Sequence, residues 1–246
     1  MPLALIAALR TFITLVVLSL YILVVGPPAL IWTTLSHNAR LLYVAGNAGV
    51  RLAFALVGIR VVLTGRENIQ SGRAAVYAAN HSSNIDPPAV FSSLSSLHPR
   101  LSTIYKASLR KLPVLVWAFD AAGFVPIERA NREQSFPAVD RAAQSLAAGH
   151  SFFIFPEGTR SRSGELLPFK KGGFLMAIAA GAPVIPVAVS GGRDAMRKGS
   201  TIIRPVTVTV DVGSPISTTG LSADDRDGLI ARVHAALEGR LPGKPQ

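Results

Sequence analysis

Apolar residues dominate the first 59 positions of the chain. Residues 11–36 carry no charged side chain, and as a helix this stretch would be about 39 Å long, more than the roughly 30 Å of a bilayer's hydrocarbon core. Gly26-Pro27-Pro28 interrupts it, because proline inside a helix removes a hydrogen bond, so the uninterrupted apolar part is Phe12–Val25. A second apolar stretch covers residues 41–59. The pattern predicts a membrane-associated helical hairpin over residues 1–59, with either one kinked spanning helix or two helices that dip into one leaflet.

A cleaved signal peptide is the alternative interpretation, with Arg10 as its basic flank and residues 12–25 as its apolar core. That interpretation leaves the second apolar stretch unexplained, so membrane anchoring is favoured. Cytoplasmic flanks of membrane helices are rich in Lys and Arg, and such side chains attract anionic headgroups. We therefore expect a cytoplasmic-membrane location with the catalytic domain on the cytoplasmic side. The arginines that carry this argument follow the first apolar stretch: Arg40, Arg51, Arg60 and Arg66.

Beyond residue 60, short apolar or β-branched runs alternate with helix-like segments. This alternation predicts an α/β domain over residues 60–240, with a central mostly parallel or mixed sheet flanked by helices; residues 241–246 are expected to be a frayed tail. Pro126 is expected at a sheet edge or strand end. The predicted strands are residues 61–65, 74–79, 101–107, 123–127, 151–155, 184–189 and 201–213. The predicted helices are residues 88–97, 108–118, 133–148, 172–181 and 222–239.

Composition narrows the classes of function. The 246 residues include 25 Lys and Arg against 14 Asp and Glu, and no cysteine. The absence of cysteine excludes a disulfide scaffold, a cysteine-ligated zinc site, an iron–sulfur centre and a thiol nucleophile. The net charge of +11 suggests an anionic partner, either a phospholipid membrane or nucleic acid. Nucleic acid is disfavoured, because neither a recognition helix nor an aromatic stacking platform is visible in the sequence.

The first chemical motif is Asn80-His81-Ser82-Ser83-Asn84-Ile85-Asp86-Pro87, which follows a predicted strand. Residues five apart do not share a helix face, but His81 and Asp86 meet if His81 lies in the loop and Asp86 begins the next helix. Asp86 then caps that helix, with Pro87 as its first residue, or it holds the His81 imidazole in one tautomer. The two roles are not exclusive.

A histidine–carboxylate pair needs something to activate. Cysteine is absent, and neither Ser82 nor Ser83 lies in a Gly-x-Ser-x-Gly turn. Such a pair can instead deprotonate a hydroxyl of the substrate. The motif therefore indicates direct transfer of a group onto an acceptor alcohol, with His81 and Asp86 as the catalytic residues.

The second motif, Phe155-Pro156-Glu157-Gly158-Thr159-Arg160-Ser161-Arg162-Ser163-Gly164, also follows a predicted strand. Guanidinium groups, a hydroxyl and the backbone amides of a flexible turn suit a phosphate group. Glu157 is unusual in an anion site, and we expect it to position Arg160 or to accept a hydrogen bond from a substrate hydroxyl. A third arginine, Arg129, ends another predicted strand segment, residues 123–129.

Together these motifs resemble those of the glycerolipid acyltransferase family, and most closely those of bacterial 1-acylglycerol-3-phosphate acyltransferases. His-x4-Asp alone is a weak signal, but four blocks in the family's order, within about residues 60–215, are specific. Pro126 departs from the aromatic or aliphatic residue common in the second block. The matching segments are His81 with Asp86, residues 123–129, residues 155–160, residues 184–187, and Lys106, which resembles a family lysine near the acyl groove.

The resemblance implies acyl transfer from acyl-CoA or acyl-carrier protein, as donor substrate, to the free hydroxyl of 1-acylglycerol 3-phosphate. It implies that His81 is the general base and that Asp86 orients it, with no metal and no cofactor. The expected partners are therefore a lysophospholipid, an acyl thioester and the phospholipid membrane. The residues implied in substrate binding are Glu157, Gly158, Thr159, Arg160 and Arg129 around the acceptor's phosphate, and Lys106 on the donor side.

Other functions stay open at this point. The acceptor could be glycerol 3-phosphate or a lyso-aminolipid, although the latter would make Arg160 and Arg129 less necessary. A membrane-anchored binding protein without catalytic activity is the alternative from another class, and the intact pair of His81 and Asp86 argues against it.

Overall fold

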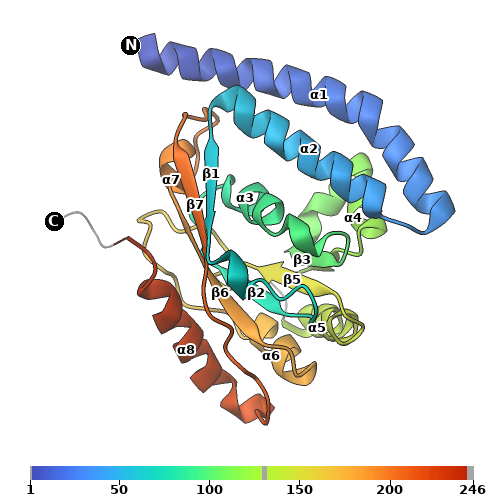
Figure 1. Cartoon of the computed structure of the whole chain (residues 1–246), viewed down its shortest axis with the longest axis vertical. Coiled ribbons are helices and arrows are strands. Elements are labelled where there is room, and N and C mark those ends of the chain that lie inside the picture. Colours follow the sequence, from blue (N-terminus) through green and yellow to red (C-terminus); the bar gives the residue numbers. More distant parts are fainter. Residues whose placement is uncertain (1, 129–131, 243–246) are drawn as a thin grey trace.

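A computed structural model describes residues 2–128 and 132–242. It begins with two long apolar helices, α1 (Pro2–Ser36) and α2 (Arg40–Val57), which run antiparallel above the rest of the molecule (Figure 1). Both are long and apolar enough to cross a membrane by length and composition. The predicted helical hairpin is therefore confirmed as a helix pair.

The prolines do not end the first helix, because α1 continues through Pro27 and Pro28, which agrees with the expected alternative of one kinked helix; whether it spans a membrane stays a prediction. A proline lacks the N–H that would bond to the carbonyl one turn earlier, and α1 bends towards its C-terminal end in Figure 1. The backbone is helical on both sides of the prolines, from Pro2 to Ser36. Most of the large apolar side chains of α1 are exposed, among them Leu23 at 70 % and Leu35 at 78 %.

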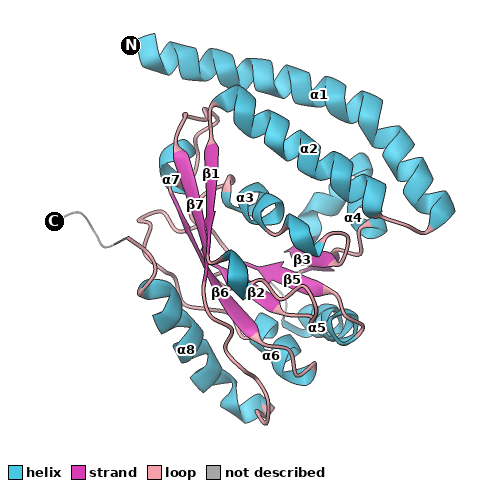
Figure 2. Cartoon of the chain, in the orientation of Figure 1, coloured by secondary structure: helices cyan, strands magenta, loops and turns pink. Residues whose placement is uncertain are grey.

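A mixed sheet of seven strands forms the centre of the molecule (Figure 2). Its strand order is β1-β7-β6-β2-β5-β3-β4; only the β6–β7 pair is antiparallel. This confirms the predicted mostly parallel or mixed sheet, and Pro126 lies in the edge strand β4, as expected. The strands are β1 (Arg60–Thr64), β2 (Val76–Ala79), β3 (Leu101–Lys106), β4 (Val125–Ile127), β5 (Ser151–Ile154), β6 (Val184–Ser190) and β7 (Thr207–Val212).

Helices cover both faces of this sheet. One hydrophobic core joins the sheet to α2 and α3, and a second joins its other face to α5, α6 and α8. The helices of the α/β part are α3 (Asp86–Ser93), α4 (Pro113–Ala121), α5 (Arg132–Ala147), α6 (Gly172–Ala179), the short α7 (Gly192–Ala195) and α8 (Arg226–Glu238).

The structure departs from the predicted elements after β6. The helix α7 was not predicted, and β7 begins at Thr207 rather than at residue 201. The preceding residues bond elsewhere, because the amide of Ile203 donates to the Thr11 hydroxyl of α1 (3.0 Å) and the amide of Arg204 donates to the Ala195 carbonyl (2.8 Å). Residues 201–206 therefore connect α1 to α7 instead of extending the sheet.

The helical hairpin and the α/β part share one core. Tyr43, Phe54 and Val57 of α2 are buried in the same cluster as Tyr77 and Leu101 of the sheet. The Tyr43 hydroxyl donates a hydrogen bond to the Leu101 carbonyl. The sequence pattern changes at the boundary expected at residue 59, but side chains from both sides of this boundary pack into one core.

Candidate active site

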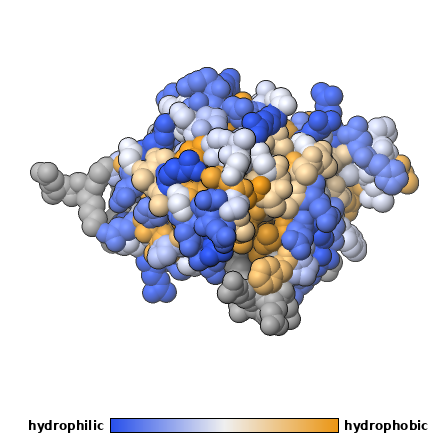
Figure 3. Space-filling view, turned by 90° about the horizontal axis from the view of Figure 1, so that it is seen from below, coloured by the Kyte–Doolittle hydropathy of each residue, from blue (hydrophilic) through white to orange (hydrophobic). Residues whose placement is uncertain are grey.

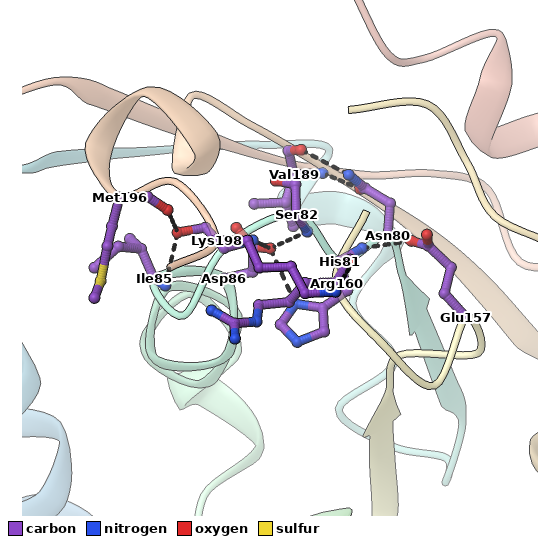
Figure 4. A network of polar contacts seen from close by, with 11 residues as sticks. Asn80, His81, Ser82, Ile85, Asp86, Glu157, Arg160, Val189, Met196 and Lys198 are labelled. Carbon is purple, nitrogen blue, oxygen red and sulfur yellow. Dashed lines mark hydrogen bonds and ion pairs between the residues drawn. The ribbon is translucent and has the colours of Figure 1, made fainter. Parts of the chain in front are cut away.

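The segment between β2 and α3 is fixed by its first residue. The Asn80 side chain donates to the Val189 carbonyl (2.9 Å) and accepts from the Val189 amide (2.7 Å), which ties the loop to the neighbouring strand β6 (Figure 4). Asn80 itself is 4 % exposed. These two hydrogen bonds fix the position of Asn80, and therefore the point from which the next residue, His81, extends away from the sheet.

His81 and Asp86 form the predicted pair. His81 Nδ1 lies 3.1 Å from Asp86 Oδ2, and the same oxygen accepts from the amides of Ser82 (2.6 Å) and Ser83 (2.7 Å). Asp86 is fully buried, whereas the His81 side chain is 14 % exposed. The buried carboxylate is therefore held by three donors, and the imidazole is the member of the pair that reaches solvent.

The expected capping role of Asp86 is wrong. Asp86 is the first residue of α3, and no side chain caps that helix. Its carboxylate instead receives the amides of the loop that precedes it. Asp86 therefore stabilises the loop conformation and orients His81 through one oxygen.

The helix α7 packs against Asp86 of the His81–Asp86 pair. A Cβ atom at Gly192 would lie 2.1 Å from Asp86 Oδ1 and 3.3 Å from Ser83 Cβ, so only glycine lets the backbone approach this closely. The Ser83 hydroxyl donates to the Met196 carbonyl (2.8 Å). Within the described residues Asp86 Oδ1 has no hydrogen-bond partner, so Gly192 is a packing contact on the carboxylate.

Glu157 supports His81 from the other side. Its Oε1 accepts from the His81 amide (2.6 Å) and its Oε2 from the Leu167 amide (3.0 Å). Burial raises the pKa of Glu157 to about 7, against the lowering effect of these two hydrogen bonds. The Phe155 ring lies beside the His81 ring, with 4.4 Å between centroids and 30° between the ring planes. Glu157 thus joins the two motifs, and direct contact of its carboxylate with substrate stays a prediction.

The remaining residues of the second motif form the more open part of the site. Gly158 has a left-handed φ of 70°, Thr159 is exposed and Arg160 is half-buried. Lys198 Nζ donates to the Arg160 carbonyl (3.0 Å), and it belongs to the network drawn in Figure 4. Because the loop has turned back towards the His81 segment, through the Ser161 amide and the His81 carbonyl (2.8 Å), both motifs border one site.

Two other predicted residues are placed differently. Lys106 is the exposed last residue of β3, and among the described residues no hydrogen bond or ion pair joins it to the His81–Asp86 pair. Arg129 lies outside the described residues, two positions after β4 ends. The carboxyl ends of β2, β5, β3 and β4 meet at one edge of the sheet because these strands are parallel neighbours.

In the part of the chain that is described, no group of three metal-ligating side chains is found.

Two cavities lie next to the site. A cavity of about 470 Å³ is bordered by Phe155, Gly158 and Lys170, and the view from below in Figure 3 shows apolar surface among hydrophilic side chains on that side of the molecule. The second cavity, of about 760 Å³, is almost wholly apolar and lies between α1, α2, α3 and α4. Ile85, the residue before Asp86, lines it, so the His81–Asp86 pair adjoins an apolar volume.

Residues 60–190 match the family model described as Acyltransferase. The chain belongs to the acyltransferase family. The resemblance inferred from the four sequence blocks is thereby confirmed, and the matched range contains both motifs of the site. Its seven-stranded sheet is accordingly the frame of an acyltransferase fold.

Curated relatives of this acyltransferase carry a more specific name. It is 30 % identical over 198 residues to a 1-acyl-sn-glycerol-3-phosphate acyltransferase of Cocos nucifera, which covers 80 % of this chain and 63 % of the relative. A protein of the same name from Limnanthes douglasii is 32 % identical, covering 78 % and 66 %. The chain thus spans less than two thirds of the length of either relative.

A solved structure extends the match over nearly the whole chain. The crystal structure of the 1-acyl-sn-glycerophosphate (LPA) acyltransferase PlsC from Thermotoga maritima superimposes with a TM-score of 0.81 at 27 % sequence identity. The match covers 96 % of each chain, so it includes the α1–α2 pair as well as the sheet.

Several supporting residues could not be found from local sequence. Val189, Gly192 and Lys198 touch the site from more than 35 residues away along the chain. The only visible signal for them is the pair Gly191-Gly192 directly after a strand, which marks a close backbone approach. These residues extend the site from two loops to three, because the β6–α7 segment closes it.

Proposed function

We propose that this acyltransferase transfers a fatty acyl group from acyl-CoA or acyl-carrier protein to the free hydroxyl of 1-acylglycerol 3-phosphate, giving phosphatidic acid. The observation that carries the proposal is the His81–Asp86 pair at 3.1 Å, with a buried aspartate and an accessible imidazole. The printed names of the relatives and of the solved structure support the choice of acceptor.

The geometry favours direct transfer without an acyl-enzyme intermediate. Cysteine is absent from the chain, and the Ser83 hydroxyl is committed to the Met196 carbonyl. His81 Nδ1 faces Asp86, so the proton is exchanged at Nε2, where a neutral imidazole accepts. His81 therefore acts on a substrate hydroxyl as a general base.

The reaction then proceeds in two steps. His81 Nε2 takes the proton of the acceptor hydroxyl while its oxygen bonds to the thioester carbonyl carbon, which gives a tetrahedral intermediate. When this intermediate collapses, the carbon–sulfur bond breaks and His81 returns the proton to the departing sulfur. The products are the ester and a free thiol, and the imidazole ends neutral. This reaction needs no metal and no cofactor besides the thioester substrate.

Asp86 stabilises the imidazolium that forms in the first step. Its negative charge lies within hydrogen-bond distance of Nδ1, and because the carboxylate is fully buried, its attraction to the imidazolium is less screened than in water. The amides of Ser82 and Ser83 hold the same oxygen in place. The pair is thus arranged before substrate binds, which lowers the cost of reaching the transition state.

The acceptor's phosphate is assigned to the more open loop. The Arg160 guanidinium and the Thr159 hydroxyl are the groups that suit a phosphate, and Gly158 supplies a flexible backbone at the same turn. Arg129 follows a strand that ends at the same edge, which makes it a second candidate. Lys106 is assigned, from the family resemblance, to the donor side.

The helix pair suits substrates that are lipids. The exposed apolar surface of α1 favours contact with a membrane, and the predominance of arginine after the first apolar stretch favours a cytoplasmic catalytic domain. An acyl chain fits the apolar cavity of about 760 Å³ beside Ile85. A lipid acceptor would then reach His81 without leaving the bilayer surface.

An acceptor panel tests the proposal. The purified full-length chain is incubated with labelled acyl-CoA or acyl-carrier protein and with 1-acylglycerol 3-phosphate, glycerol 3-phosphate or a lyso-aminolipid, and products are separated by thin-layer chromatography. We expect labelled phosphatidic acid from the first acceptor. If product formed only with another acceptor, the proposed acceptor would be wrong. If no acceptor gave product, the proposed acyl-transfer activity would be wrong.

A further inference from the structure

A basic groove runs along the face of α2 that is turned away from α1. Arg40, Asn47 and Arg51 share this face, because they are spaced at helical intervals of seven and four residues. Two adjoining cavities of about 380 and 340 Å³ share Arg51 and extend past Ser93, His98 and Arg66. These residues are called the α2 groove here: Arg40, Asn47, Arg51, Arg66, Ser93 and His98.

The charge of the α2 groove is uncompensated. Across residues 2–128 and 132–242, the side chains of Arg40, Arg51 and Arg66 form no ion pair, and no described Asp or Glu lines either cavity. All three arginines are exposed. Arg51 lines both cavities, with Arg40 at one end and Arg66 at the other. Guanidinium groups that line a concave site favour phosphate, which accepts hydrogen bonds from several donors at once.

Polar atoms in the walls also have no partner. Asn47 Oδ1, Ser93 Oγ and His98 Nε2 are buried without a hydrogen bond within the described structure. Burial lowers the pKa of His98 to about 4, and its ring bonds the Phe91 backbone through the other nitrogen, so at neutral pH Nε2 is an acceptor. These atoms lie just beneath the surface of the groove, so a headgroup reaches them only when a wall side chain rotates aside. The Ser93 hydroxyl then donates to the anion, and Asn47 Oδ1 and His98 Nε2 then accept from a ligand hydroxyl.

The surroundings of the α2 groove identify the source of such a ligand. Val44 is 58 % exposed, lies between Arg40 and Arg51 along α2 and lines the same cavity. Leu41 on the same helix is 43 % exposed, and Figure 1 shows α2 lying between α1 and α3. Apolar and cationic side chains alternate on one helix surface, which is the arrangement that suits the headgroup region of a bilayer.

The α2 groove is distinct from the catalytic edge. Ser93 is at the C-terminal end of α3, whereas Asp86 is at its N-terminal end, which separates the two along the helix axis by about 10 Å. None of the residues assigned to the reaction lines either cavity. We propose that the α2 groove binds the phosphate and hydroxyls of an anionic phospholipid headgroup, such as that of phosphatidylglycerol, independently of substrate.

Lipid retention by the full-length chain tests this proposal. The protein in detergent is titrated with phosphatidylglycerol or with phosphatidylcholine of the same acyl chains, and bound lipid is counted by native mass spectrometry. We expect one phosphatidylglycerol to bind with clear preference. The combined variant Arg40→Gln/Arg51→Gln should bind it about 30-fold more weakly, roughly fivefold for each arginine. Equal binding by this variant would overturn the proposal.

Matched variants separate a specific site from general charge. Arg232→Gln removes an exposed arginine of α8 and should leave the preference intact. Arg51→Lys keeps the charge but loses the guanidinium donors, so its binding should fall between that of the wild type and that of the combined variant. If Arg232→Gln weakened phosphatidylglycerol binding as much as the combined variant does, the proposal would be overturned. Circular-dichroism melting confirms that each variant is folded.

Binding measurements with other ligands and with one further variant identify the ligand. Phosphatidylethanol, which has the phosphate but no free hydroxyl, should bind more weakly than phosphatidylglycerol; equal binding would overturn the assignment of Asn47 and His98. Inorganic phosphate in large excess should fail to displace the lipid, and displacement would overturn the lipid source. Loss of the preference in Arg160→Ala would instead place the lipid at the catalytic edge. Since binding is measured without turnover, failure of the proposed activity leaves this result unaffected.

Discussion

The two loops that build the candidate site differ in how firmly they are held. In the loop after β2, Asn80, Ser83 and Asp86 are almost fully buried and each is hydrogen-bonded. In the loop after β5, Thr159 and Arg162 are exposed, and Arg160 is half-buried with a bond to its backbone carbonyl. The first loop is thus held by its own hydrogen bonds without substrate, and the second presents exposed side chains that can bind a ligand.

This difference matches the two tasks proposed for the loops, which are proton transfer for the first and phosphate recognition for the second. A proton-transfer pair must be positioned in advance, because a displacement of about 1 Å can cost roughly 100-fold in rate. Arginines that recognise a phosphate gain their partner only on binding, so they can remain solvated until then. Changes in the first loop should therefore lower kcat, and changes in the second should raise KM.

The largest effect is expected for His81→Ala. Without the imidazole nothing takes the proton of the acceptor hydroxyl, and we expect kcat to fall about 1000-fold or more. Steady-state kinetics with 1-acylglycerol 3-phosphate measures it. The matched control is His37→Asn, which changes an exposed histidine with a positive φ of 52° to a residue that tolerates this conformation. Turnover of His81→Ala within tenfold of the wild type would exclude it as the base.

Gly192→Ala tests whether rigidity itself matters. The added Cβ would overlap Asp86 Oδ1 at 2.1 Å and so must displace the carboxylate or α7. We expect kcat to fall roughly 100-fold with little change in KM. The control is Gly228→Ala in α8, where a Cβ meets no atom within 4 Å. If Gly192→Ala keeps full kcat, the supporting role of α7 is refuted.

Arg160→Ala tests the recognition loop. Loss of a charged hydrogen bond to the acceptor's phosphate should raise KM about 10- to 100-fold, with kcat changed much less. Arg162→Ala, two residues further along the exposed part of the loop, should leave both values near those of the wild type. A fall in kcat alone for Arg160→Ala would contradict the proposed division between the loops.

Glu157, which bonds to both loops, should give the smallest effect. Its pKa in the folded chain is about 7 against an ordinary value of 4.5, so between these values the folded state binds more protons than the unfolded state. The free energy of unfolding should therefore fall as the pH rises from about 4.5 to about 7, and this contribution should level off above. Urea unfolding at several pH values measures it. In Glu157→Gln this decline should be shallower, and an unchanged decline would exclude Glu157 as its source.

Sequence reasoning succeeded where the determinants are local. Short apolar runs between helical patterns predicted all seven strands, and a five-residue spacing sufficed to pair His81 with Asp86. It failed where distant contacts decide. The late start of β7 and the four-residue helix α7 depend on partners elsewhere in the chain, at Thr11 for the first and at Ser83 and Asp86 for the second.

The same limit applies to the site. The bonds of Asn80 to Val189 and of Ser83 to Met196 join residues 109 and 113 positions apart, and no local pattern predicts them. Glu157 was expected to act on Arg160 or on substrate, but its carboxylate lies between two backbone amides. Side-chain type indicated which chemistry to expect, whereas the support of that chemistry required the fold.

The packing of α2 against α3 has a consequence for how the protein is made. Tyr43, Phe54 and Val57 of α2 complete the core over Leu94 and Leu101. Because α1 and α2 are the N-terminal elements, they leave the ribosome first, and α2 is present to cover the core of the α/β part as that part emerges. We expect a fragment starting at residue 60 to aggregate unless α1–α2 is supplied as a separate peptide, which sedimentation of the two fragments would show. Folding of the α/β part would then depend on a helix pair that is made before it, and loss of that pair would remove the core as well as the apolar surface.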